Sequence, residues 1–229
     1  MKDSRITEFF SGVRDELPIL LGVIPFGVIF GALAVHNDLS PFAAQATSTI
    51  IFAGSAQFIA VQLMGAGASV AVVLMVVFVV NVRHALYSAS VAPYIAHLKP
   101  LWKYVLAYFL TDEAYAVAIT KYDQDGVTST RHWYFLGAGV TLWTAWQIST
   151  LLGIRIGAGM GENWPVGFAL PLTFIALVVP ALKDRPSVAA AITAGIVGLL
   201  TVNFPYKTGL LLAALCGIAV GLLLEKRTA

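Results

Sequence analysis

The chain of 229 residues carries 14 basic and 12 acidic side chains, together 11% of its length, and 59% of its residues are apolar. Soluble domains have roughly 25% charged and 45–50% apolar residues, so these charges are too few to cover a soluble core. The net charge of +2 is scattered, which excludes a nucleic-acid-binding surface. The single cysteine, Cys216, excludes disulfides and cysteine-based metal sites. We therefore expect a membrane protein embedded in a lipid bilayer.

Uncharged stretches long enough to cross a bilayer occur throughout the chain. A spanning helix needs about 20 predominantly apolar residues. The stretches cover residues 17–37, 39–82, 132–154, 163–182, 186–206 and 208–224. The second of them holds 44 residues, so it must turn back at least once.

The first element expected in chain order is a short helix over 5–14. It is either an amphipathic helix that lies at the membrane interface or a frayed end of the chain. A first span over 17–35 is expected to kink at Pro25. The further spans are 42–64, 70–84, 101–120, 132–154, a segment over 163–182 broken by Pro165, Pro171 and Pro180, 187–202 and 208–224. The predicted fold class is all-α, a polytopic membrane protein with seven or eight transmembrane segments in a single domain, 1–229.

An internal similarity suggests two structural repeats, 15–122 and 132–226. Phe52-Ala53 and Phe58-Ile59-Ala60 match Phe168-Ala169 and Phe174-Ile175-Ala176 at a constant offset. Both copies hold residues that break helices, Gly54-Ser55 in the first and Leu170-Pro171 in the second. Secondary transporters place their sites at broken helices between repeats. Coincidence among few residue types is the alternative explanation.

Apart from Lys103, whose side chain can reach the membrane surface from a span end, three charged residues fall inside expected spans: Arg83, Asp112 and Glu113. Each costs about 2.5–3.5 kcal/mol near the bilayer centre, so we expect them to be paired or solvated. Arg83 with either acid forms a structural ion pair or a functional site. The neighbouring His84 either relays a proton near neutral pH or donates an interhelical hydrogen bond.

A second polar feature is the patch Phe52–Phe58, which contains Gly54, Ser55, Gln57 and Phe58. Its small residues can open the backbone, and Gln57 offers two donors and an acceptor, so the patch could bind a carboxylate or an ammonium group. Close helix packing is the alternative. Trp143, Trp146 and Gln147 are interpreted as packing residues. We expect no enzyme activity, since the sequence holds no hydrolase, nucleotide-binding or metalloprotease motif.

Three ordered polar motifs resemble a known family of membrane proteins. Together with a later apolar segment they are similar to the AzlC-type branched-chain amino acid exporters, and the resemblance covers about residues 10–224. The motifs are Phe52-x-Gly54-Ser55-Ala56-Gln57-Phe58, Asn81-x-Arg83-His84-x-Leu86-Tyr87-Ser88, Thr111-Asp112-Glu113-x-Tyr115 and Phe168-Ala169-Leu170-Pro171-Leu172-x-Phe174.

The resemblance implies the large subunit of a two-component exporter in the bacterial cytoplasmic (inner) membrane. Its substrates would be valine, leucine and isoleucine, and in some members methionine. It implies a small AzlD-type membrane subunit as partner, coupling to the proton gradient, and no cofactor.

An amino-acid site needs a cationic or N–H-rich end, an anionic end and an apolar wall. Arg83 or the backbone at Gly54 and Ser55 would take the carboxylate, with Gln57 and Asn81 beside it. The wall would be Phe58 and Phe174. Asp112 or Glu113 would take the ammonium group or the coupling proton, and His84 would be a further proton-coupling residue. The alternatives are a channel-like or scaffold subunit, or a transporter of another small amino acid or anion.

Overall fold

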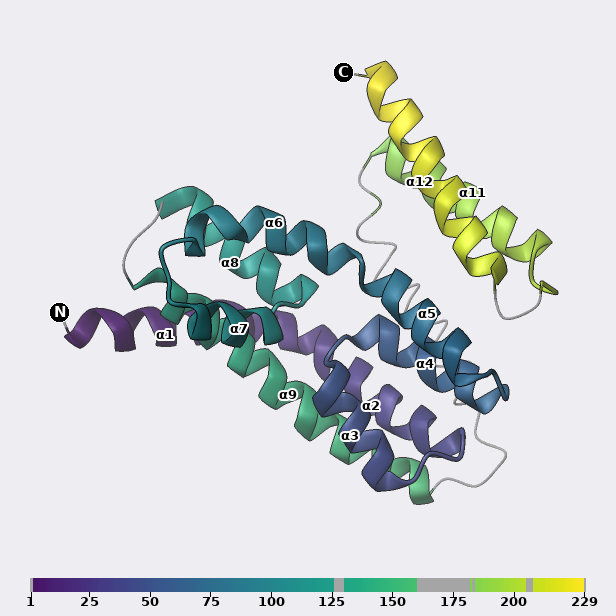
Figure 1. Ribbon diagram of the computed structural model, residues 1–229, viewed down its shortest axis with the longest axis horizontal. Coiled ribbons are helices and arrows are strands. Elements are labelled where there is room, and N and C mark those ends of the chain that lie inside the picture. Colours follow the sequence, from purple (N-terminus) through teal and green to yellow (C-terminus); the bar gives the residue numbers. More distant parts are fainter. Residues whose placement is uncertain (1, 126–129, 160–181, 183, 205–207, 229) are drawn as a thin grey trace. The chain divides into compact units, whose positions relative to one another are not determined.

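The computed structural model describes residues 2–125, 130–159, 182, 184–204 and 208–228. Every regular element within these ranges is a helix, which confirms the all-α fold class. The chain divides into two compact units, Met1–Val166 and Gly167–Ala229, which we describe separately (Figure 1). Large apolar side chains such as Leu21, Phe42 and Phe78 are exposed, as expected of a protein surface that faces lipid.

Most of the helices belong to the first unit. They are α1 (Lys2–Glu16), the 3₁₀ turn η1 (Leu17–Ile19), α2 (Leu20–His36), α3 (Pro41–Ile51), α4 (Gly54–Gly65), α5 (Val70–Asn81), α6 (Arg83–Ile95), α7 (Pro100–Tyr108), α8 (Asp112–Asp125) and α9 (Arg131–Gly159). The second unit holds α11 (Arg185–Leu200) and α12 (Thr208–Thr228).

The first unit is organised around α9, against which α1 and α2 pack lengthwise. The approach is close because glycines face the backbone of the opposite helix. A Cβ on Gly31 of α2 would overlap the carbonyl oxygen of Thr150, and one on Gly153 of α9 would overlap that of Val28. Small residues permit this kind of helix contact in membranes.

The N-terminal helix is longer than expected from the sequence. It covers Lys2–Glu16 instead of 5–14 and continues through η1 into α2. It packs on α9 close to Tyr134, so it is an ordered part of the first unit and does not fray. α2 continues through Pro25, and the start of the expected first span, Leu17–Ile19, forms the 3₁₀ turn η1. The kink at Pro25 stays a prediction.

The expected second span is broken in its middle, as the small-residue patch predicts. α3 ends at Ile51, Phe52 adopts a left-handed conformation with φ of 38°, and Ala53 is extended before α4 starts at Gly54. The positive φ of a bulky residue is costly, so the surrounding structure must impose it.

The expected fourth span, 101–120, is also broken, and here the prediction of a continuous helix was wrong. α7 ends at Tyr108 and α8 begins at Asp112. The Thr111 hydroxyl accepts a hydrogen bond from the Ala114 amide at 3.3 Å, which satisfies a free N–H at the start of α8. Asp112 and Glu113 stand in the first helical turn, where the helix dipole favours negative charge.

The expected third span is α5 followed directly by α6. At Val82 the hydrogen bonding becomes tighter than in an α-helix, because the Val82 amide donates to the Val79 carbonyl, three residues back, at 3.2 Å. The backbone of Val82 itself stays helical. The stretches Arg5–His36 and Val70–Ile95 are each long and apolar enough to cross a membrane. The total of seven or eight spans stays a prediction.

In the second unit, α11 and α12 form an antiparallel helical hairpin. Gly209 lies against Thr201 near the turn, and Gly217 and Gly221 lie against Ala190 further along. The expected broken span 163–182 lies largely outside the described residues, including all three of its prolines and the second copy of the internal similarity. The duplication therefore also stays a prediction.

We expect Asp184→Ala to weaken the first turn of α11, and Asp184→Asn to preserve it. The Asp184 carboxylate accepts a hydrogen bond from the Ser187 amide at 2.7 Å, and an asparagine oxygen can accept the same bond. This bond lowers the pKa of Asp184 in the folded state. Its stabilising contribution is thus present above the pKa of the unfolded chain and is lost as the pH falls through the folded-state pKa.

Hydrogen exchange at the Ser187 amide measures this capping contribution. Protection should fall on acidification in the wild type and stay constant in Asp184→Asn. Equal protection in the wild type and Asp184→Ala at neutral pH would contradict the assignment.

Candidate functional site

The two broken helices of the first unit meet at their breaks. The Tyr108 hydroxyl, at the end of α7, donates a hydrogen bond to the Thr49 carbonyl of α3 at 2.6 Å. The Phe52 and Tyr108 rings lie 6.1 Å apart. Trp143 of α9 donates to the Tyr108 hydroxyl at 2.8 Å and so fixes this contact to the central helix.

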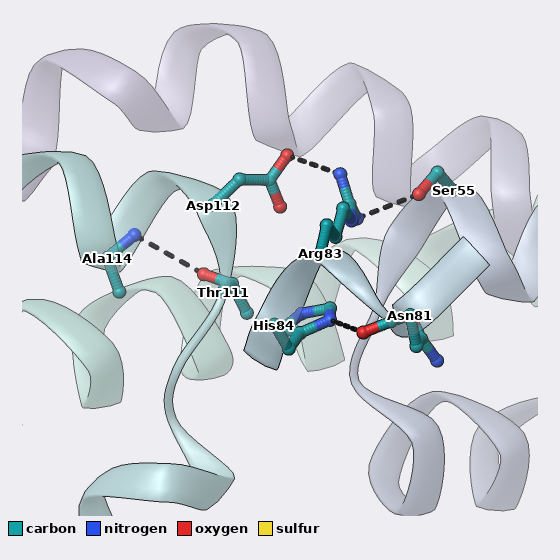
Figure 2. A network of polar contacts seen from close by, with 7 residues as sticks. All are labelled: Ser55, Asn81, Arg83, His84, Thr111, Asp112 and Ala114. Atoms are coloured by element: carbon teal, nitrogen blue, oxygen red, sulfur yellow. Dashed lines mark hydrogen bonds and ion pairs between the residues drawn. The ribbon is translucent and has the colours of Figure 1, made fainter. Parts of the chain in front are cut away.

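Arg83 lies between the starts of α4 and α8, beyond these two breaks. Its Nη2 donates to the Ser55 hydroxyl at 2.8 Å, and its Nη1 donates to the Asp112 carboxylate at 3.0 Å (Figure 2). Ser55 stands in the first turn of α4 and Asp112 in the first turn of α8. The guanidinium therefore ties three helices together, and the fork geometry of arginine makes both contacts possible.

The ion pair is only partly enclosed. The Arg83 side chain is 28% exposed and the Asp112 side chain is 44% exposed. The third guanidinium nitrogen, Nε, is buried and has no hydrogen-bond partner among the described residues. The pair thus offsets the cost of two charges in an apolar segment and leaves one donor of Arg83 unused.

Asn81 and His84 adjoin Arg83 on the same stretch of helix. The His84 Nδ1 lies 3.1 Å from the Asn81 carbonyl oxygen (Figure 2). The Asn81 side-chain oxygen is buried, and within the described part of the chain it has no hydrogen-bond partner. The Nε of Arg83 and the side-chain oxygen of Asn81, which have no hydrogen-bond partner among the described residues, therefore lie two residues apart, on either side of Val82.

Further polar and aromatic contacts join α6 to α8. The Tyr87 ring of α6 stacks on the Tyr115 ring of α8 with centroids 4.6 Å apart. The Tyr115 hydroxyl lies 3.0 Å from Ser90 Oγ, one turn further along α6. Glu113, adjacent to Asp112, contributes no contact to Arg83 and turns to another side of α8.

Gly54, Gln57 and Phe58 serve the core of the first unit. Gln57 points away from Ser55 across α4, is fully buried, and accepts a hydrogen bond from the Ala53 amide at 3.2 Å. Its side-chain nitrogen has no hydrogen-bond partner among the described residues. Phe58 packs on Phe26 with ring centroids 4.4 Å apart, and Gly54 lies against the same phenylalanine. The sequence-predicted Phe174 lies outside the described residues.

Two features of the unit escaped the sequence reasoning. Gln147, interpreted as a packing residue, accepts hydrogen bonds from Gln45 at 2.7 Å and from Thr49 at 3.0 Å, and so joins α3 to α9. Glu16, which lies just before the first expected span, is fully buried at the end of α1. A polar residue flanked by other polar residues at the edge of an apolar run gives little sequence signal of burial.

These features define an all-α membrane protein whose charged site is built at two helix breaks. A family model described as "AzlC protein" matches residues 18–160. The chain therefore belongs to the AzlC family.

Relatives support this assignment over almost the whole chain. The chain is 30% identical over 223 residues to the "Inner membrane protein YgaZ" of Escherichia coli (strain K12), covering 94% of this chain and 90% of that protein. It is 30% identical over 220 residues to an "Uncharacterized membrane protein" of Archaeoglobus fulgidus, covering 93% and 94%. A Helicobacter pylori relative with the same description is 29% identical over 181 residues, covering 77% and 78%. No solved structure matches.

Proposed function

We propose that this chain is the large subunit of a secondary transporter that exports branched-chain amino acids across the bacterial inner membrane. Membership of the AzlC family supports this role. The observation that carries it is the position of Arg83, held by Ser55 and Asp112 between the first turns of two broken helices. Transporters bind small charged substrates at such interruptions, where helix N-termini and freed backbone groups face the ligand.

The site has the polar groups that a zwitterionic amino acid requires. The substrate carboxylate would bind the unused Nε of Arg83 and the free amide groups at the start of α4. The ammonium group would bind Asp112 and the side-chain oxygen of Asn81. Because substrate would compete with Asp112 for Arg83, binding would loosen the link between the helices and so favour a conformational change.

An apolar cavity of about 410 Å³ between α6, α7 and α9 would take the substrate side chain. Its walls include Val91, Leu106, Leu110 and Phe135, and also Ser88, Tyr104 and Lys103. Ser88 is five residues beyond Arg83, which is about 7.5 Å along a helix. Aliphatic walls at that distance suit valine, leucine and isoleucine, whereas a charged side chain would lose its hydration there.

Alternating access would use the breaks as hinges, and a proton moving inward would drive export. His84, Asp112 and Glu113 are the candidates for proton coupling around Arg83. We further propose that a small AzlD-type subunit completes the transporter and that the chain catalyses no chemical reaction.

An efflux assay with an amino-acid panel tests the proposal. The chain would be reconstituted into vesicles with and without the small subunit, and the vesicles loaded with labelled valine. We expect saturable efflux that requires both subunits and is inhibited by leucine and isoleucine but not by lysine or glutamate. Non-saturating conductance would indicate a channel instead. Saturable efflux of another amino acid alone would overturn the branched-chain assignment.

A further inference from the structure

Glu16 is a buried acid that makes no contact with Arg83 among the described residues. It is the last residue of α1, directly before η1, and its side chain is fully buried. Neither carboxyl oxygen has a hydrogen-bond partner among the described residues. An ionised carboxylate in such a position is strongly disfavoured, whereas a neutral carboxylic acid is tolerated.

The basic groups on the neighbouring helices are used elsewhere. Arg131 of α9 forms an ion pair at 3.4 Å with Glu8, which lies about two helical turns before Glu16 on α1. Lys121 of α8 lies over the Tyr134 ring, 6.0 Å from its centroid. Tyr134 itself donates a hydrogen bond to Asp15, the neighbour of Glu16, at 2.8 Å. None of these contacts involves Glu16, and among the described residues no ion pair to Glu16 is found.

An acid on the helix packed against α1 connects Glu16 to the Arg83 site. α1 packs against α8, and Glu113 stands in the first turn of α8, so the two acids lie on contacting helices. Glu113 is adjacent to Asp112, which holds Arg83. Two neighbouring carboxyl groups in an apolar environment do not ionise together, so a proton on one favours ionisation of the other.

We propose that Glu16 is the proton-binding residue of the transport cycle and exchanges its proton with Glu113. Protonation converts the Glu16 carboxylate to the neutral acid, and release to Glu113 leaves the charge on Glu16, with no change in oxidation state. A proton arriving on Glu113 lowers the negative charge beside Asp112 and thereby changes how firmly Arg83 is held. This inference rests on the proposed transport function, which it extends by naming the residue that carries the coupling ion.

Proton-driven transport provides the first test. Two rates are measured in vesicles containing the complete transporter: amino-acid efflux driven by a pH gradient, and amino-acid exchange at equal pH on both sides. The ratio of the first rate to the second is expected to fall about tenfold or more in Glu16→Gln, as when the coupling between two ligands is lost. Asp38→Asn is the matched control. It removes an exposed acid at a φ of 62°, which asparagine tolerates, and should leave the ratio unchanged. A wild-type ratio in Glu16→Gln would overturn the proposal.

Infrared spectroscopy gives a second test that does not depend on transport. The purified wild-type protein should show a protonated carboxyl band at neutral pH, and this band should be missing in Glu16→Gln and present in Asp38→Asn. An unchanged band in Glu16→Gln would overturn the assignment. If the wild type exports no amino acid, the proposed function fails, and the infrared result still decides whether Glu16 binds a proton.

Discussion

Arg83→Ala is expected to abolish amino-acid efflux. Truncation removes the group that holds both Ser55 and Asp112, and it leaves Asp112 as an uncompensated charge in an apolar segment. Losing one partner of a desolvated charge pair costs about 2–5 kcal/mol. Because this pair is partly exposed, we expect the lower part of that range, about 2–3 kcal/mol, as the loss of folding stability. Efflux is lost because the substrate carboxylate has no cationic partner.

Two further variants separate charge from geometry at this position. Arg83→Lys keeps the charge but lacks the planar fork, so it can reach Ser55 or Asp112 but not both in the same way. Its efflux should lie between that of the wild type and that of Arg83→Ala. Arg155→Ala, a change at an exposed position on α9, controls for the loss of an arginine elsewhere and should retain wild-type efflux.

The double variant Arg83→Ala/Asp112→Ala decides between an ion pair that only links helices and a binding site. Removing both charges eliminates the unpaired group, so thermal stability should recover relative to either single variant. If the pair only links helices, efflux should recover with it. We expect stability to recover while efflux stays at the level of Arg83→Ala. Efflux within twofold of the wild type in either Arg83→Ala variant would disprove the site.

The sequence predicts the pairing of Arg83 for a physical reason. Charged residues are so costly inside apolar spans that they must find partners, and only two acids, Asp112 and Glu113, fall inside the expected spans with Arg83. The break before Gly54 followed from its small residues. The bonds from Arg83 to Ser55, by contrast, depend on how α4 approaches α6, and no local pattern encodes that approach.

The break before α8 was missed although its local signal was present. Thr111 followed by Asp112 and Glu113 is a typical helix start, with a capping hydroxyl and two acids in the first turn. The apolar content of residues 101–120 concealed this signal, because hydropathy alone favours one continuous span. Capping patterns inside hydrophobic stretches are therefore informative about broken helices. The burial of Glu16 lacks any such local signal, since it results from the packing of α1 on distant helices.

The second large effect is expected at the contact between α2 and α9. Gly31→Leu would place a side chain where the Thr150 carbonyl oxygen of α9 already lies, and Gly153→Leu would do the same against Val28 of α2. Backbone cannot give way as a flexible side chain can, so the helices must separate. Overpacking of this kind costs about 1–3 kcal/mol or more at each site.

Gly22→Leu is the matched control, since it lies on the same helix as Gly31 and a Cβ there would meet no atom within 4 Å. Thermal unfolding of the purified protein should show a large loss of stability for Gly31→Leu and Gly153→Leu, and little change for Gly22→Leu. Separation of α2 from α9 would also displace Phe26 and Phe30, which pack on Trp146 of α9 and on Phe58 of α4. Because α4 presents Ser55 to Arg83, the glycine variants should lose efflux together with stability, whereas Arg83→Ala/Asp112→Ala should lose efflux alone. Wild-type stability in Gly31→Leu would show that α2 and α9 do not pack at this distance.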